Sequence, residues 1–204
     1  PGWDLTGLSC VDPDNGSSAS VTTRTATIDL DPGETVTCTF VNTERGSITI
    51  VKNVTGVTDG TFDFTSNALG GFQLATVDLT DSTPFPNLVP GVYDVAEVDP
   101  APDYDLTSAT CDDGSDPSAI SLQAGEHVTC TFVNTERGSI TIVKNVTGVT
   151  DGTFDFTSNE LGDFQLATVG GTDSTPFPNL VPGDRKSTRL NSSHSSVSRM
   201  PSSA

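Results

Sequence analysis

Residues 130–145 read CTFVNTERGSITIVKN, and residues 38–53 read the same sequence. On each side of the polar TERG turn, apolar residues alternate with polar ones, which is the periodicity of a half-buried β-strand. Before the second turn, Val128, Cys130 and Phe132 share one face. The stretch therefore predicts two strands joined by a tight turn, and its repetition predicts a fold built from copies of one β-module.

The composition favours an all-β, turn-rich chain with small cores. The chain has 204 residues and a formal net charge of −18, with 33% hydrophobic residues, 19 Gly and 13 Pro. Such acidity argues against nucleic-acid binding, because the phosphate backbone would be repelled. No apolar run is long enough to form a transmembrane segment, and nothing in the sequence indicates a cofactor.

Internal repeats divide the chain into modules. Residues 44–91 recur as 136–183 with four substitutions. These are Ala68 to Glu160, Gly71 to Asp163, Asp78 to Gly170 and Leu79 to Gly171. The opening GWDLTGLSC also matches the later DYDLTSATC. We therefore predict the C-terminal part of one module over 1–43, a complete module over 44–135 and the N-terminal part of a third over 136–183.

Residues 184–204 do not belong to the repeat. After PNLVPG the complete module continues with VYDVAEVDP, whereas the last copy continues with DRKSTRLNSSHSSVSRMPSSA. Read back into codons, this segment resembles a short-read sequencing adapter. We predict an artefactual, disordered tail that packs on nothing and has no part in the function.

About seven short strands are expected in the complete module, which favours an Ig-like β-sandwich. The expected strands cover 46–53, 61–66, 72–78, 92–98, 104–111, 119–122 and 126–135. The Pro-rich stretch 81–91 is expected to be a connection. Because a module of this size buries only a modest core, it gains from covalent cross-links.

Two cysteines fall in each C-terminal half-module, namely Cys10 with Cys38 and Cys111 with Cys130. There is no CxxC motif and no His at ligand spacing, so a zinc site is not expected. The acidic, repetitive chain is typical of an exported protein. We therefore predict that both pairs are disulfides, with free thiols as the alternative.

Two Asp-rich loops, 11–16 and 111–118, offer carboxylates of the kind that calcium prefers. Asp and Gly are also the residues that tight turns need, and neither loop contains a complete calcium-binding pattern. We therefore expect no metal site.

Lys52, Glu97 and Asn134 each end a run of alternating apolar residues. A buried ammonium or carboxylate is costly unless it is paired, so the three side chains are expected to meet. One interpretation is a Lys–Glu ion pair completed by a hydrogen bond from the Asn amide. The other is chemical: a Lys made neutral by burial is a nucleophile, and a protonated Glu can polarise the Asn carboxamide. Ammonia would then leave and a Lys–Asn amide would form.

Three segments resemble the prealbumin-like, SpaA-type or Cna-B-type domains that build the stalks of bacterial surface proteins and pilins. They are GSITIVKN at 46–53, LVPGVYDVAEVDPAPDY at 88–104 and TFVNT at 131–135. The resemblance extends over essentially all of 1–183, and it implies a prealbumin-like β-sandwich in each module.

The resemblance also implies roles for particular residues. In such domains a first-strand Lys and a last-strand Asn often form an intramolecular isopeptide bond, which a Glu assists. Those roles fall on Lys52, Asn134 and Glu97, and the catalytic role of the Glu is limited to this self-modification. Asn42 and Lys144 match the motif as orphan isopeptide positions, since their partners are not in the sequence. The cysteine pairs depart from the best-known isopeptide domains.

We predict a structural stalk or spacer in an extracellular protein of the bacterial cell surface, and not an enzyme. The predicted partners are neighbouring modules of the same chain, together with an unknown tip domain or ligand. The alternative is an adhesin whose modules contact host, matrix or glycan. The near-identity of the copies favours the spacer. Because the TERG turn leaves few residues between modules, little reorientation is expected there.

Overall fold

The computed structural model describes residues 2–183 and the backbone of 191–193. Within this part the chain forms β-strands and one short 3-10 helix, η1 (Pro117–Ala119). The chain divides into two compact units, one of Pro1–Pro100 with Leu106–Asn134 and one of Ala101–Asp105 with Thr135–Ala204. The fold is therefore all-β, as the composition predicted.

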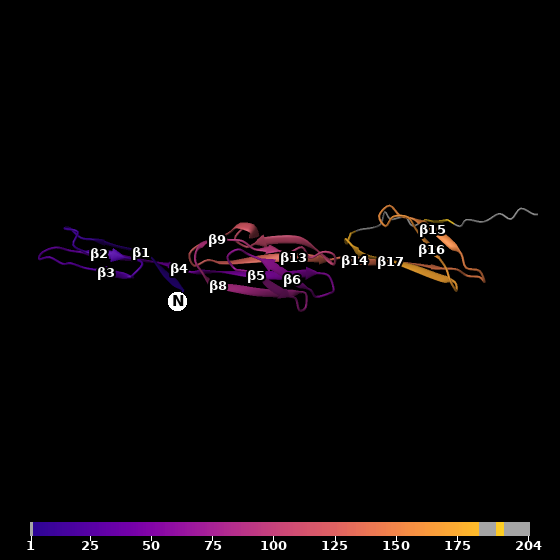
Figure 1. The fold of residues 1–204 in the computed structure, drawn as a ribbon, viewed down its shortest axis with the longest axis horizontal. Coiled ribbons are helices and arrows are strands. Elements are labelled where there is room, and N and C mark those ends of the chain that lie inside the picture. The colour runs from indigo at the N-terminus through magenta and orange to yellow at the C-terminus, as the bar shows by residue number, and fades with distance from the viewer. Residues whose placement is uncertain (1, 184–190, 194–204) are drawn as a thin grey trace, which may run out of the picture. The chain divides into compact units, whose positions relative to one another are not determined.

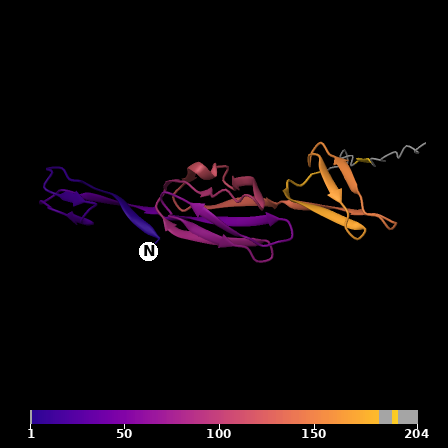
Figure 2. The same ribbon diagram turned by 45° about the vertical axis from the view of Figure 1, so that its right-hand side comes forward.

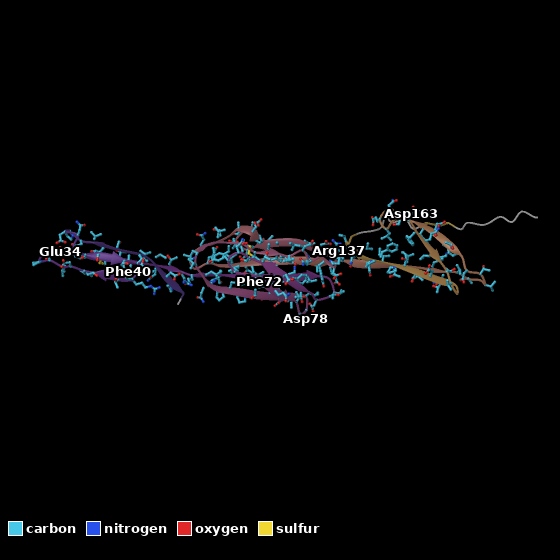
Figure 3. All side chains as sticks on the ribbon, in the orientation of Figure 1. Glu34, Phe40, Phe72, Asp78, Arg137 and Asp163 are labelled. Carbon is cyan, nitrogen blue, oxygen red and sulfur yellow. A yellow bond between two sulfur atoms is a disulfide. The ribbon has the colours of Figure 1, made fainter. Side chains whose placement is uncertain are left out.

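The first unit begins with an antiparallel hairpin, which is drawn in indigo in Figure 1. Its strands are β1 (Trp3–Val11), β2 (Ser18–Ser20), β3 (Thr25–Thr27) and β4 (Thr37–Glu44), with β1 paired to β4 and β2 to β3. Trp3 and Phe40 remain more than half exposed, and Phe40 is labelled in Figure 3. This hairpin therefore contributes little apolar core of its own.

The rest of the first unit is a β-sandwich, called here the central sandwich. One layer is a four-stranded sheet in the order β11 (Tyr104–Cys111), β13 (His127–Glu136), β5 (Gly46–Thr55), β8 (Thr80–Leu88). The other layer contains the sheet β10 (Ala96–Glu97), β6 (Thr61–Thr65), β7 (Phe72–Ala75) and the pair β12 (Ile120–Leu122), β9 (Gly91–Tyr93). Figures 1 and 2 show the strands of these layers from two directions.

The core of the central sandwich lies between the two layers. The Phe64 ring of β6 meets the Phe132 ring of β13 edge to face, with centroids 5.2 Å apart. Figure 3 shows the side chains that fill the sandwich, with Phe72 labelled. The buried apolar residues are Ile48, Ile50, Val54, Phe62, Phe64, Leu74, Val95, Ile120, Leu122, Val128, Cys130 and Phe132. Full burial of each large apolar side chain stabilises the fold by about 2 kcal/mol.

The Pro-rich stretch 81–91 is mostly a strand, so the prediction of a connection there is wrong. Residues 80–88 form β8, which pairs antiparallel with β5 and places Pro84 opposite Thr49. β8 lies at the edge of its sheet. A proline has no N–H to donate, and an edge strand tolerates this because one of its sides is unpaired.

The single strand expected over 92–98 is divided between two sheets. β9 pairs with β12, whereas β10 pairs with β6. Between them the backbone N–H of Val95 donates to the carbonyl of Pro117 at 2.8 Å. The division places Glu97 opposite Phe64 on β6, in the layer that faces β5 and β13.

The second unit contains the antiparallel pairs β14 (Gly138–Asn145) with β17 (Thr172–Leu180), and β15 (Thr153–Thr157) with β16 (Phe164–Ala167). Its buried cluster is small and consists of Phe154, Phe156 and Leu166. The same sequence repeats the local pairing of β5 with β8 and of β6 with β7.

The expectation that 184–204 packs on nothing is wrong for residues 191–193. They form β18 (Asn191–Ser193), which pairs antiparallel with β15 and places Ser192 opposite Phe156. In the central sandwich β10 pairs with the equivalent edge of β6. An open strand edge offers unpaired N–H and C=O groups that any backbone can satisfy, whatever its side chains. The other residues of the predicted tail, 184–190 and 194–204, lie outside the described residues.

Candidate functional site

The structure brings Lys52, Glu97 and Asn134 together inside the central sandwich. Lys52 lies on β5 and Asn134 on the neighbouring β13, and both point into the core because they share the phase of the apolar residues around them. Glu97 comes from β10 in the facing layer. The sequence predicts that Lys52 ends its run of inward-facing residues. The structure corrects this, because Val54 continues the run.

One carboxylate contacts both other groups. The Lys52 Nζ donates to Glu97 Oε2 at 3.0 Å, and the Asn134 Nδ2 donates to Glu97 Oε1. The exposed fraction is 0% for Lys52 and Asn134 and for the Glu97 side chain. Water is therefore excluded from an ion pair that has one amide as its neighbour.

Burial sets the electrostatics of the lysine. Desolvation lowers the pKa of Lys52 below its ordinary value, and the hydrogen bond to Glu97 opposes this effect only in part. The ammonium also lies 4.5 Å from the centroid of the Phe62 ring, which provides a cation–π contact. The neutral amine is thus more accessible to Lys52 than to a lysine in water.

The amide of Asn134 is only half satisfied. Its Oδ1 is buried and has no hydrogen-bond partner, although its Nδ2 donates to Glu97. An orphaned buried carbonyl costs about 1–3 kcal/mol. If Glu97 took a proton from Lys52, its new hydroxyl could donate to Oδ1 of Asn134 once the side-chain amide had rotated by half a turn. The arrangement can therefore activate a carboxamide next to an amine.

The two orphan positions have different surroundings. Lys144 on β14 is half-buried, and its Nζ lies 4.3 Å from the centroid of the Phe154 ring, which matches the contact of Lys52 with Phe62. Within the described residues Lys144 makes no ion pair. Asn42 on β4 is exposed and lies opposite Leu5 of β1.

A comparison with known families identifies the domain. Residues 1–44 and 48–136 match the model of a family described as a prealbumin-like fold domain, of the SpaA type. The chain belongs to this family. The matched residues include Lys52, Glu97 and Asn134. No curated protein matches the chain.

Domains of the SpaA type belong to cell-surface proteins and are typically structural modules without enzymatic activity. In the described part of this chain, no helix has the length and apolar character needed to span a membrane.

Both predicted disulfides are present in this SpaA-type chain. Cys10 joins Cys38 between β1 and β4, and Cys111 joins Cys130 between β11 and β13, with Cα atoms 4.0 Å and 3.9 Å apart. None of the four cysteines is free. Each bond closes a short loop, of 28 and 19 residues respectively. Loop closure of this size stabilises a fold by about 3 kcal/mol in the chain-entropy treatment.

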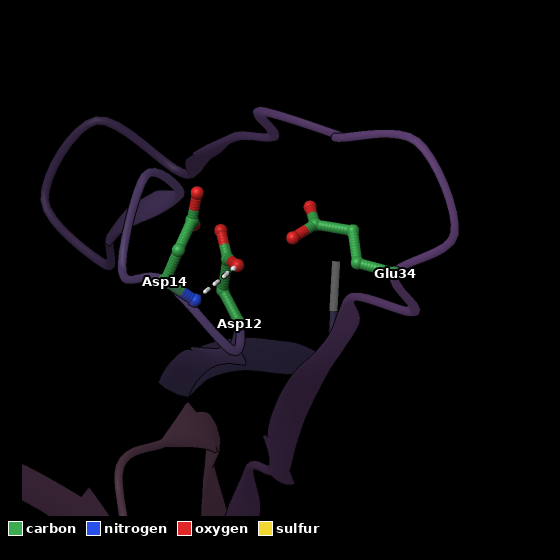
Figure 4. A group of neighbouring side chains, drawn as sticks. All are labelled: Asp12, Asp14 and Glu34. Atoms are coloured by element: carbon green, nitrogen blue, oxygen red, sulfur yellow. Dashed lines mark hydrogen bonds between the residues drawn. The ribbon is translucent and has the colours of Figure 1, made fainter.

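An acidic cluster in the hairpin was only partly visible in the sequence. One carboxylate oxygen each of Asp12, Asp14 and Glu34 lies within 4.8 Å of the others. Figure 4 shows the three side chains. The sequence indicates the loop 11–16 but not Glu34, because Glu34 comes from a distant loop that the β1–β4 pairing brings close. The hydrogen bond from Ser17 lowers the pKa of Asp12. The backbone N–H of Gly16 donates to Asp14, and that of Ser17 donates to Asp12. These hydrogen bonds explain both aspartates as turn residues.

Proposed function

We propose that this chain is part of a stalk on the surface of a bacterial cell, and that its complete module, residues 44–135, cross-links itself. The cross-link is an amide between Lys52 Nζ and Asn134 Cγ, and Glu97 assists its formation. The module is flanked by partial copies over 1–43 and 136–183. Their role is mechanical: they separate another part of the protein from the cell.

The observation that carries the proposal is the shared carboxylate. Lys52 and Asn134 are both fully buried and both bind Glu97. An ion pair alone has no need of a buried amide with an unpaired oxygen, because that oxygen costs free energy. A reaction between the amine and the carboxamide uses all three groups.

The proposed reaction is balanced by the three side chains alone. A proton moves from the Lys52 ammonium to Glu97, which leaves a neutral amine and a carboxylic acid. The amine nitrogen attacks Cγ of Asn134, and Glu97 stabilises the developing charge on Oδ1. Glu97 then carries one proton from the former Lys52 nitrogen to Nδ2, which departs as ammonia. The products are a secondary amide and one molecule of ammonia.

Such a bond would suit a stalk because of where it lies in the chain. β5 is the first strand of the central sandwich and β13 is its last. A pulling force that enters at β5 and leaves at β13 would pass through the Lys52–Asn134 amide. The strands between them would then bear little of the load. The disulfide between β11 and β13 cannot replace this bond, because it leaves β5 unconnected.

Intact mass spectrometry of the full chain under non-reducing conditions tests the cross-link. We expect a mass lower by one ammonia than the sequence with two disulfides requires, and a branched peptide that joins Lys52 to Asn134 after proteolysis. Lys52→Met and Glu97→Gln should each restore the full mass.

Lys144→Met is the matched control, because Lys144 occupies the same repeat position and makes the same aromatic contact. It should leave the loss of ammonia unchanged. A wild-type chain of full mass would overturn the cross-link, as would a branched peptide that contains Lys144 in place of Lys52.

A further inference from the structure

The single residue between β4 and β5 is an arginine that contacts both the hairpin and the central sandwich. Arg45 Nε and Nη2 donate to the two carboxylate oxygens of Asp4 on β1, at 2.7 and 2.8 Å. Its Nη1 donates to the backbone carbonyl of Asn87 on β8 at 3.0 Å. One guanidinium thus bonds the strand pair on one side of the turn and the sandwich on the other.

Backbone contacts surround the same turn. The N–H of Arg45 donates to the carbonyl of Gly2 at 2.8 Å. The carbonyl of Glu44 accepts from Gly125, and the N–H of Ser47 donates to the carbonyl of Glu126. The turn is therefore held from the hairpin side and from the β12–β13 loop of the sandwich.

The bidentate pair of arginine with aspartate recurs at the second TERG turn, within the second unit. Arg137 Nε and Nη2 donate to the two carboxylate oxygens of Asp105, at 2.9 and 2.5 Å, and its backbone N–H donates to Asp103. Asp4 and Asp105 occupy the same place in the matching segments GWDLT and DYDLT. Because the bidentate Arg–Asp pair occurs at both turns, we infer that the pair belongs to the repeat and is not peculiar to the first turn.

We propose that Arg45 is a clamp between the hairpin and the central sandwich. The clamp restricts the angle between these two parts of the first unit. This inference concerns the junction and does not depend on the Lys52–Asn134 bond. It gives the short linker a specific means of resisting reorientation, since modules joined by a small interface otherwise move relative to one another.

The chemistry of the guanidinium explains why an arginine occupies the turn. Its planar fork matches both oxygens of a carboxylate and still has a third nitrogen for a carbonyl, which a lysine cannot reproduce. The side chains of Arg45 and Asp4 remain 32% and 28% exposed, so salt screens the contact in part. The hydrogen bond from Arg45 lowers the pKa of Asp4, as Arg137 does for Asp105.

Residual dipolar couplings of the full chain, weakly aligned, test the clamp. In the wild type, backbone amides of β1 and β4 should fit the same alignment tensor as those of β5, β6 and β13. In Arg45→Gln and in Arg45→Lys, the degree of order of the hairpin relative to the sandwich should fall by about half or more, as expected for modules joined without a fixed interface.

Two further variants keep the test decisive. Asp4→Asn removes the acceptor and should reproduce the loss of order, even if Arg45→Gln disturbs the turn itself. Arg24→Gln removes an equal charge from the same hairpin and should leave the order unchanged. The proposal would be overturned if the hairpin and the sandwich had separate alignment tensors in the wild type. It would also be overturned if they shared one tensor in both Arg45→Gln and Asp4→Asn. Its failure would leave the mass test of the cross-link unaffected.

Discussion

The Lys52 ammonium lies 3.0 Å from the Glu97 carboxylate, with neither side chain exposed to solvent. A charge pair removed from water gains little net free energy unless further polar contacts complete it. Here the amide nitrogen of Asn134 donates to the second oxygen of Glu97. The amide oxygen of Asn134, Oδ1, is left without a hydrogen-bond partner. The site thus combines a cost in stability with an amine and a carboxamide on one carboxylate.

Removing one member of this pair should be more damaging than removing both. In Asn134→Ala, where no amide can form, adding Lys52→Met leaves the Glu97 carboxylate buried without its cation, and we expect a further loss of about 3–5 kcal/mol in the free energy of unfolding. Adding Glu97→Leu as well should recover part of that loss. Urea denaturation followed by the amide signals of the central sandwich measures both changes. Equal losses with and without Glu97→Leu would contradict a buried, charged Glu97.

Blocking the cross-link should reveal the titration of Lys52. In Asn134→Ala no amide can form, so Lys52 keeps an amine whose folded pKa is lowered from 10.5 by burial. Between the folded pKa and 10.5 the unfolded chain binds more protons, so the stability of this variant should rise as pH rises. A cross-linked wild type has no amine at this position and should lack this rise. The free energy of unfolding, measured from neutral pH to 10.5, distinguishes the two.

Two glycines at the same repeat position should respond differently to alanine. A Cβ on Gly46 would lie 2.5 Å from the backbone carbonyl of Glu126, whereas a Cβ on Gly138 would have only the carbonyl of Leu180 nearby, at 4.0 Å. Gly46→Ala should therefore destabilise the central sandwich by about 1–3 kcal/mol. Gly138→Ala should be neutral or stabilising by about 0.5 kcal/mol. Hydrogen exchange of β5 and β14 amides reports each unit, and similar effects at both sites would refute the close approach.

The disulfide of the central sandwich should contribute stability independently of the cross-link. Replacing Cys111 and Cys130 together by Ala should lower the free energy of unfolding of the sandwich by about 3 kcal/mol. The double variant at Cys10 and Cys38 is the control, because that bond joins β1 to β4 in the hairpin. It should leave the hydrogen-exchange protection of β5 and β13 unchanged. If both double variants weaken the sandwich equally, the two disulfides do not act locally.

The repeat made much of the fold accessible from the sequence. Strict alternation around TERG identified the strands that became β4, β5, β13 and β14. The same alternation placed Lys52 and Asn134 on the inward face, because the side-chain period of a strand leaves no other choice. The disulfides were predicted on other grounds, namely two cysteines in each C-terminal half-module, no metal-ligand pattern and a chain of exported character.

Other features depended on contacts that alternation does not encode. The role of 80–88 as strand β8 was hidden by its prolines, which are acceptable only because β8 lies at an edge. The pairing of residues 191–193 with β15 depended on an open edge and not on their own sequence. The proximity of Glu34 to Asp12 arose from the pairing of β1 with β4.

The sequence by itself determined which residues face the core and which positions recur, because both follow from periodicity along one chain. Only the tertiary structure decided which of those residues touch. Asn134 reaches the same carboxylate as Lys52 because β13 neighbours β5, and Glu97 reaches both because β10 lies in the facing layer. Likewise, Asp4 meets Arg45 because β1 and β4 pair across the hairpin and bring the start of the chain beside the turn. Such contacts arise from strand order and sheet packing, which bring together residues far apart in sequence.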